Sequence, residues 1–185
     1  MATSSKAMTL EQFLWLPEKK PALEFEDGRV TRKAWPNGKH SACQGGLLEL
    51  FNRYARPLRV ALAFPELRTT FADRSYVPDI SVYLQPRIPI DEEGYVANEF
   101  FKPPDIAIEI KSPEQSLASQ VRRCQWFVEN GVPLALLAYP EQKSVRRFIP
   151  GEERQLLTGQ DPIDMAPVLP GFGPTVALVF ESLKV

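Results

Sequence analysis

The sequence is short of the residues from which several kinds of catalytic site are built. It contains one histidine, His40, and two cysteines in 185 residues. A zinc site made of two or three histidines, or of several cysteines, is therefore excluded. A catalytic triad would have to use His40 itself. Cys43 and Cys124 lie far apart on predicted helices, so a reduced cytosolic pair is the simpler interpretation and a disulfide is the alternative.

A basic excess and a long apolar run are also missing. The chain has 22 Lys and Arg against 23 Asp and Glu, a formal charge of -1. A nonspecific DNA-binding protein normally carries a basic excess, so any nucleic-acid surface here must be local. The longest apolar stretch, residues 134–139, is far too short to cross a bilayer. With no apolar run behind a basic start, we expect a cytoplasmic protein with no secretory signal and no membrane partner.

The length and composition are those of one globular domain. The hydrophobic fraction is 44%, which is normal for a folded chain and argues against disorder. We expect a single domain over residues 1–185. Its expected parts are an N-terminal helix and hairpin (9–31), a core (37–149) and an irregular C-terminal tail (150–185).

Periodicity and turn residues predict the elements of this domain. A short helix begins at Thr9 with Gln12 three residues on, as in a capping box, and Asp27-Gly28 between extended residues predicts a hairpin. A longer helix covers 39–56, where apolar residues recur at helical spacing. Further strands are expected at 59–64, 66–71, 78–84 and 105–111. The segment 85–104 has little periodicity, and a loop of that length is often functional.

Residues 105–139 have the pattern of a strand, a helix and a second strand. Ser112 and Gln115 flank Pro113 as in a capping box, so we expect a helix that begins there and ends at Gly131. The continuous apolar run 134–139 is typical of a strand buried on both faces. The unit predicts a parallel strand pair, with a further strand at 143–149 near an edge. The fold class is therefore α/β, with a mixed sheet.

Strand alternation places a carboxylate and an ammonium on one face of the strand 105–111. The isoleucines at 106, 108 and 110 share the other face, which must pack on the core. Glu109 and Lys111 are about 6.6 Å apart along the strand. The earlier strand places Asp79 opposite its own apolar face. If the two strands are neighbours, Asp79 can meet Glu109 and Lys111.

Two carboxylates suit a hard cation such as Mg²⁺. The ion can polarise a phosphoryl oxygen and acidify a water, and a lysine can offset transition-state charge. The Glu-x-Lys triplet alone is weak evidence, because the chain contains three of them, at 18–20, 109–111 and 141–143, and about one is expected by chance. Only the triplet at 109–111 lies on a strongly predicted strand. The alternatives are a Pro-Asp turn for Asp79 and a solvated, salt-bridged strand face for Glu109 and Lys111.

Three segments carry a resemblance to a known family. They are Val77-Pro-Asp-Ile-Ser-Val-Tyr83, Pro103-Pro-Asp-Ile-Ala-Ile-Glu-Ile-Lys-Ser-Pro113 and Glu129-Asn-Gly-Val132. In this order they resemble the Uma2 family, also known as DUF820. Its members are restriction-endonuclease-like proteins of the PD-(D/E)XK nuclease superfamily and are abundant in cyanobacteria. The similarity covers roughly residues 9–149.

The resemblance implies a restriction endonuclease-like core, a central mixed sheet flanked by helices. It also implies Mg²⁺-dependent cleavage of DNA, with Mn²⁺ as a substitute ion, often as a homodimer and without an organic cofactor. Onto this chain it carries Asp79 and Glu109 as metal ligands, the backbone carbonyl of Ile110 as a further ligand, and Lys111 as the catalytic lysine. His40 matches a position where the family often has histidine, and it could equally be a helix-start residue.

Other polar residues lie near these motifs. Asp105 is about 13 Å along the strand from Glu109, too far to share an ion, so we expect a turn or supporting role. Gln120 and Arg123 share one side of a helix; we favour a solvated face for both, and a place at the site or on a phosphate is the alternative. Glu49 points to the opposite helix face from His40, so we do not assign it to the site.

The sequence therefore favours a Mg²⁺-dependent DNA endonuclease. A degenerate nuclease fold, kept as a nucleic-acid-binding or protein-interaction module, is the first alternative, because the basic excess and a helix acid are missing. A hydrolase of smaller phosphoesters is a third interpretation, since it needs only the same three residues.

Overall fold

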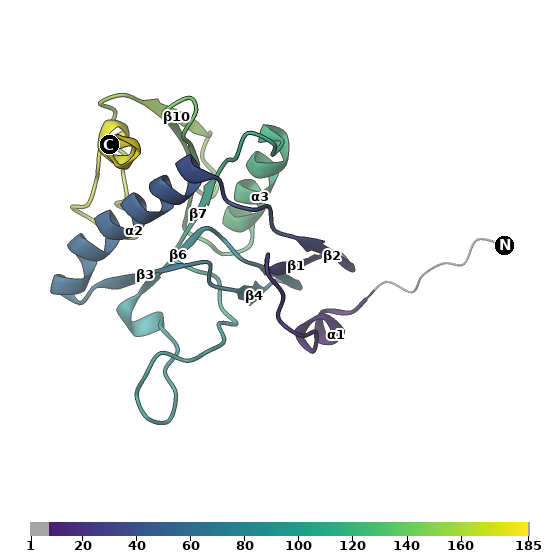
Figure 1. Cartoon of the computed structure of the whole chain (residues 1–185). Helices are drawn as coiled ribbons and strands as arrows, with labels where there is room; N and C mark the ends of the chain where they lie inside the picture. Colours follow the sequence, from purple (N-terminus) through teal and green to yellow (C-terminus); the bar gives the residue numbers. More distant parts are fainter. Residues whose placement is uncertain (1–7, 185) are drawn as a thin grey trace.

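A computed structural model describes residues 8–184 of the chain as two sheets and two long helices (Figure 1). The main sheet is mixed, in the order β10-β9-β8-β7-β6-β3. Its strands are β3 (Ala61–Pro65), β6 (Ile80–Leu84), β7 (Ile106–Ile110), β8 (Leu134–Tyr139), β9 (Ser144–Phe148) and β10 (Gln155–Thr158). The helices are α1 (Leu10–Leu14), α2 (Gly38–Leu58), α3 (Leu117–Glu129) and α4 (Val176–Val179), with 3-10 turns η1 (Gln85–Arg87) and η2 (Glu181–Leu183).

A smaller antiparallel sheet lies beside the main one and includes the N-terminal hairpin. Its order is β2-β1-β5-β4, formed by β1 (Leu23–Glu26), β2 (Arg29–Arg32), β4 (Thr69–Phe71) and β5 (Arg74–Tyr76). The hairpin turns at Asp27 and Gly28, which both have positive φ, as the Asp-Gly signal predicts. Thr9 caps α1 through the predicted capping box with Gln12. Both N-terminal predictions are confirmed.

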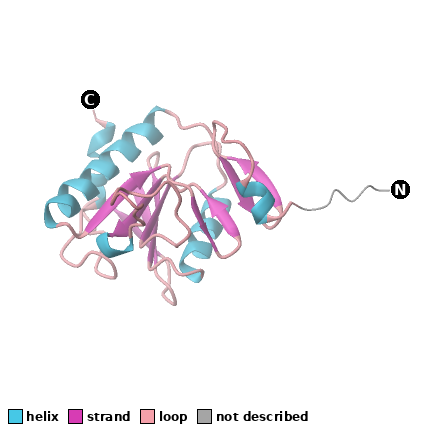
Figure 2. Cartoon of the chain, turned by 90° about the horizontal axis from the view of Figure 1, so that it is seen from below, coloured by secondary structure: helices cyan, strands magenta, loops and turns pink. Residues whose placement is uncertain are grey.

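The parallel pair predicted for residues 105–139 is present at the centre of the main sheet. β7 pairs with β8 in parallel, and with β6 in an antiparallel register that places Ile80 opposite Ile108. The two long helices cover opposite faces of this sheet (Figure 2). Every residue of β7 is therefore buried, including Glu109. The face that carries Glu109 is not a solvated one.

The helix of this unit begins later than the capping-box pattern predicts. α3 starts at Leu117 with Ser116 as its N-cap. The Ser112 amide does donate to Gln115 Oε1 (2.9 Å), but the Gln115 amide donates to the Ser112 carbonyl (3.1 Å). Half of the expected capping box therefore closes a turn, and the helix follows that turn. The C-terminal end agrees with the prediction, since α3 ends at Glu129 and Gly131 has a φ of +97°.

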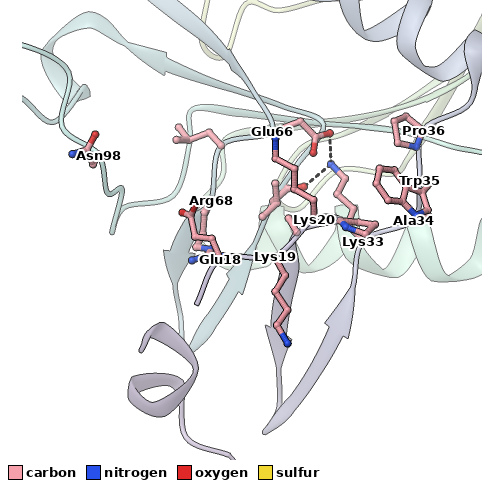
Figure 3. Close-up of a pocket in the computed structure, with 14 residues that line it drawn as sticks. Glu18, Lys19, Lys20, Lys33, Ala34, Trp35, Pro36, Glu66, Arg68 and Asn98 are labelled. Carbon is pink, nitrogen blue, oxygen red and sulfur yellow. Dashed lines mark hydrogen bonds and ion pairs between the residues drawn. The ribbon is translucent and has the colours of Figure 1, made fainter. Parts of the chain in front are cut away.

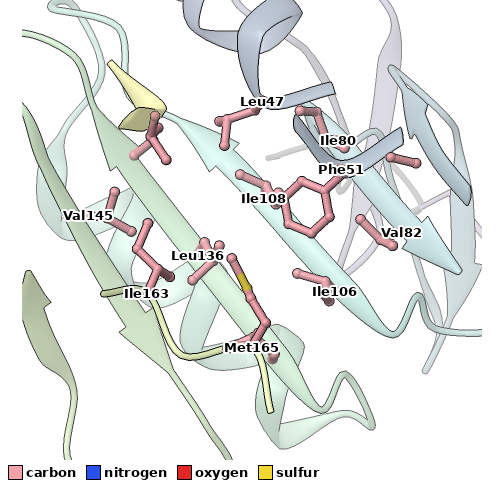
Figure 4. Close-up of a cluster of buried hydrophobic side chains, with 14 of the residues drawn as sticks. Leu47, Phe51, Ile80, Val82, Ile106, Ile108, Leu136, Val145, Ile163 and Met165 are labelled. Atoms are coloured by element: carbon pink, nitrogen blue, oxygen red, sulfur yellow. The ribbon is translucent and has the colours of Figure 1, made fainter. Parts of the chain in front are cut away.

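The C-terminal tail is not irregular, which corrects our expectation for residues 150–185. It contributes β10, α4 and η2, and several of its apolar side chains enter the core between the main sheet and α2. Ile163, Met165 and Val176 are fully buried there, in contact with the cluster that includes Phe51 and Ile108 (Figure 4). These side chains fill the part of the core that the long helix leaves open.

Cys43 and Cys124 are both free and buried, one on each long helix. Because the helices lie on opposite faces of the sheet, the two thiols belong to different apolar clusters, which supports the reduced pair over the disulfide. Over residues 8–184, no helix has the length and apolar character needed to cross a membrane.

Candidate functional site

Asp79 and Glu109 are brought side by side by the antiparallel pairing of β6 and β7. Asp79 immediately precedes β6, and the Ile80–Ile108 register sets it beside the end of β7. The Ile110 amide donates to Asp79 Oδ2 at 2.6 Å. Both carboxylates are almost inaccessible, at 1% and 2% exposure. The expected adjacency of the two strands, on which the inclusion of Asp79 depended, is therefore present.

Two cationic or polar side chains hold the Asp79 carboxylate. Lys33 Nζ lies 2.6 Å from Oδ1, and His40 Nε2 lies 3.1 Å from Oδ2. His40 is positioned by the start of α2, where the Asn37 side chain accepts from the His40 amide (2.9 Å). Burial alone would raise the pKa of Asp79, but the contacts with His40 and Lys33 outweigh it, so that the pKa lies below its ordinary value. Asp79 is thus a buried, charged carboxylate.

Glu109 has a different cationic partner. Glu109 points to the same sheet face as Ala107, the face that α3 covers. One guanidinium nitrogen of Arg123 in α3 lies 3.3 Å from Glu109 Oε1. The same guanidinium forms an ion pair with Glu24 of β1. Burial raises the pKa of Glu109 above its ordinary value against the opposing charge of Arg123, and the negative charge of Asp79 adds to the rise.

Lys111 does not contact either carboxylate. Its ammonium donates to the Ser112 carbonyl at 3.0 Å and lies 4.4 Å from the centre of the Tyr139 ring. Among the described residues, no carboxylate lies within ion-pairing distance of Lys111. The structure therefore separates Lys111 from the pair that sequence analysis expected it to join, and Lys33 is the lysine in contact with Asp79.

The remaining candidates divide between the site and the scaffold. Arg123 faces the site, so the solvated helix face that we favoured is wrong for this residue. Gln120, one turn earlier, is 7% exposed and is also not solvated. Asp105 accepts from the Leu84 amide (2.8 Å) and pairs with Arg87 at the far end of β7, which fits the turn rather than a supporting role at the site.

Sequence analysis missed two residues of the site, Lys33 and Glu24. Glu24 is a buried acid (3% exposed) between two buried apolar residues of β1, and it accepts from the Val77 amide at 2.9 Å. Its place in an apolar strand was a usable signal. Lys33 follows β2 and gave no comparable signal, because its contact depends on how the small sheet sits against the main one.

The donor atoms at this site are of the type that Mg²⁺ prefers. Asp79, Glu109 and the Ile110 carbonyl offer oxygen ligands on two adjacent chain segments. Between Met8 and Lys184, no three His, Cys, Asp or Glu side chains are gathered closely enough to hold an ion as they stand. Lys33 and Arg123 instead provide the positive charge at the carboxylates. The residues fit the ion by their chemistry, and binding it requires these two side chains to give way.

Comparisons with known proteins agree with this geometry. Residues 10–178 match the Uma2 family, whose description is "Putative restriction endonuclease". The chain is similar to a crystal structure described as a putative nuclease belonging to DUF820 from Anabaena variabilis ATCC 29413, with 36% identity and a TM-score of 0.90. That alignment covers 95% of this chain and 99% of the other. No curated protein matches the chain.

The family match spans most of the chain, and the similar crystal structure shares the same mixed sheet flanked by helices. Both comparisons point to a restriction-endonuclease-like nuclease. The chain belongs to the Uma2 family.

Proposed function

We propose that this protein is a Mg²⁺-dependent endonuclease that hydrolyses phosphodiester bonds in DNA. The observation that carries the proposal is the approach of Asp79 and Glu109 across the β6–β7 pair, which the Ile110 amide fixes by its 2.6 Å bond to Asp79. Two buried carboxylates beside two cations that are themselves only 9% and 18% exposed are expensive to desolvate and are typical of functional sites rather than of scaffold.

Asp79, Glu109 and the Ile110 carbonyl are the groups that would hold the ion. When bound, Mg²⁺ supplies positive charge that polarises a phosphoryl oxygen and makes a water more acidic. The protein contributes orientation. His40 and the Ile110 amide both hold Asp79 Oδ2, so that Oδ1 is turned toward Lys33. A carboxylate fixed in this way needs little reorganisation when charge develops beside it.

Two lysines could stabilise the charge of the reacting phosphate. Lys33 is in contact with Asp79, whereas the family resemblance assigns the role to Lys111, whose ammonium lies on the Ser112 carbonyl. For Lys111 to stabilise the phosphate, its side chain must rotate away from the Ser112 carbonyl. Substituting each lysine separately distinguishes the two.

Cleavage of supercoiled plasmid in Mg²⁺ or Mn²⁺ tests the proposal. We expect the wild type to nick the plasmid and Asp79→Asn to reduce the rate by about 100-fold or more. Asp73→Asn makes the same chemical change at an exposed turn and serves as the control, with an unchanged rate expected. Equal cleavage by wild type and Lys111→Ala would rule out a catalytic role for Lys111.

A second candidate function is a non-catalytic binding module. The specific observation in its favour is that Lys33 and Arg123 neutralise the two carboxylates while Lys111 faces elsewhere. Titration calorimetry with Mg²⁺ discriminates the two functions. Measurable binding that is lost in Asp79→Asn supports the nuclease, and no binding by either protein supports the module.

A further inference from the structure

A groove of about 690 Å³ opens beside the candidate site. Three short segments line it, at 18–22, 33–36 and 66–68 (Figure 3). Lys33 joins the groove to the site, because it lines the groove while its Nζ contacts Asp79. The same ammonium donates to the Val77 carbonyl (2.8 Å) and forms an ion pair with Glu66 (2.9 Å). A ligand in this groove would therefore lie against Lys33, the side chain that separates the groove from Asp79.

The groove carries a local basic excess that the whole chain lacks. Lys19 and Lys20 are exposed and Arg68 is partly exposed, and all three line the groove. Lys33 is shared between Glu66 and Asp79, so the remaining cations, Lys19, Lys20 and Arg68, face Glu18 and Glu66. The chain as a whole has a formal charge of -1. The groove is thus a local surface of the kind that nucleic-acid binding requires in this protein.

Arg68 is held in the groove by packing rather than by an acid. Its guanidinium carbon lies 5.5 Å from the centre of the Phe13 ring, and its buried Nε has no hydrogen-bond partner among the residues that the structure describes. No acid among the described residues pairs with this partly exposed side chain, so its charge is not neutralised within the protein.

Trp35 gives the groove an aromatic wall. Its side chain is 71% exposed at the segment that follows Lys33, and it lies on the side of Lys33 opposite to Arg68 (Figure 3). A large aromatic ring left in water beside a row of cations is the combination by which proteins bind single strands, with bases stacked on rings and phosphates on Lys and Arg. A duplex keeps its bases stacked inside and offers none to Trp35.

We propose that this groove binds single-stranded nucleic acid, with phosphates on Lys19, Lys20 and Arg68 and an unpaired base stacked on Trp35. The proposal deepens the nuclease function and rests on it, because the groove ends at Lys33, whose ammonium contacts Asp79. The size of the groove suits nucleotide-sized groups and is too small for a duplex to enter.

Fluorescence anisotropy in EDTA tests the binding without cleavage. The probes are fluorescein-labelled oligonucleotides of about 12 residues, as single-stranded DNA, single-stranded RNA and duplex DNA, at about 50 mM NaCl. We expect the single strands to bind at least tenfold more tightly than the duplex. Lys19→Glu/Lys20→Glu should weaken single-strand binding by about 10- to 100-fold and flatten its salt dependence, and Trp35→Ala should weaken it by about tenfold.

The matched control is Arg56→Glu/Lys184→Glu, which makes the same change of charge at exposed positions that do not line the groove. Its affinity should stay within about twofold of wild type. Circular dichroism and thermal melting establish that each variant is folded. Tighter binding of the duplex, or equal losses in the groove and control variants, overturns the proposal.

Metal-dependent cleavage of the plasmid and of the single-stranded DNA probe by the same variants separates this proposal from the proposed function. If the wild type cleaves and Lys19→Glu/Lys20→Glu binds single strands as tightly as the wild type, the groove is not the binding site and the proposed nuclease function is unaffected. Single-strand binding that depends on the lysines and Trp35, without any cleavage in Mn²⁺, supports the groove and refutes the nuclease. The two single-strand probes report whether the 2′-hydroxyl matters.

Discussion

Lys33 Nζ lies 2.6 Å from Asp79 Oδ1, closer than any other cation of the described chain comes to the candidate metal ligands. Burial disfavours the charged ammonium, but the carboxylates of Asp79, Glu109 and Glu66 outweigh that effect and raise the pKa of Lys33. Lys33 is therefore a built-in counter-ion of Asp79, and a divalent ion must compete with it.

Lys33→Met is expected to bind Mg²⁺ or Mn²⁺ about tenfold more tightly than wild type, because the competing ammonium is gone while the aliphatic stem remains. Titration calorimetry measures the affinity. Lys111→Met is the control, since Lys111 contacts neither carboxylate. An affinity that is unchanged in Lys33→Met, or that rises equally in both variants, contradicts the counter-ion role.

Arg123→Met is expected to destabilise the protein by about 3–5 kcal/mol, because it leaves Glu24 and Glu109 buried without their common cation. Urea unfolding followed by circular dichroism measures the change. Arg122→Met is the matched control one position away, on the exposed side of α3, and should cost less than about 0.5 kcal/mol. Similar losses in the two variants would show that the ion pairs of Arg123 add nothing to stability.

Local patterns predicted most of the elements and about half of the site. Alternation within 105–111 identified Glu109, and the run 134–139 identified the neighbouring parallel strand. The pairing of β6 with β7, which brings in Asp79, is a long-range contact that no local pattern encodes, and it came from the family resemblance. The direction of Lys111 also escaped prediction, because alternation fixes the face of a strand and not where a long side chain ends.

Contacts between the two sheets were out of reach of sequence reasoning. Lys33 and Glu24 enter the site from the small sheet, which packs against the main one through tertiary contacts alone. The tail gave a similar difficulty. Ile163 and Met165 are buried on either side of the exposed Asp164, but an alternation of three residues is too short to predict a strand or to mark them as core.

The paired glycines of α2 offer a test of this tertiary packing. A Cβ atom at Gly46 would lie 2.5 Å from Ser182 Cβ of η2, whereas a Cβ at Gly45 meets nothing within 4 Å. Gly46→Ala should destabilise the protein by about 1–3 kcal/mol, because η2 must shift. Gly45→Ala should stabilise it by up to about 1 kcal/mol, because alanine favours the helix. Thermal melting of the two variants should therefore move in opposite directions, and a shared direction would show that η2 does not pack on α2.

The two buried thiols should react slowly in the folded protein and quickly once it unfolds. Burial raises the pKa of Cys43 to about 12, with a further contribution from the charge of Asp79, and burial also raises the pKa of Cys124. At pH 8 an unfolded thiol with a pKa of about 8.5 is partly thiolate, whereas a folded thiol with a pKa of about 12 is almost wholly protonated. Reaction with Ellman's reagent should therefore be slow in buffer and should release two equivalents at once in denaturing urea.

The same pKa shift fixes the sign of a pH effect on stability. Below about pH 8.5 both the folded and the unfolded Cys43 are protonated, so the thiol contributes no pH dependence. Above it the unfolded state loses its proton while the folded state keeps it, and the free energy of unfolding falls by up to about 1.4 kcal/mol per pH unit. The fall continues until the folded pKa of about 12 is reached. Cys43→Ala should remove this part of the decline above pH 8.5 even though the lost sulfur lowers stability at every pH. Identical slopes for wild type and variant would contradict a buried, protonated Cys43.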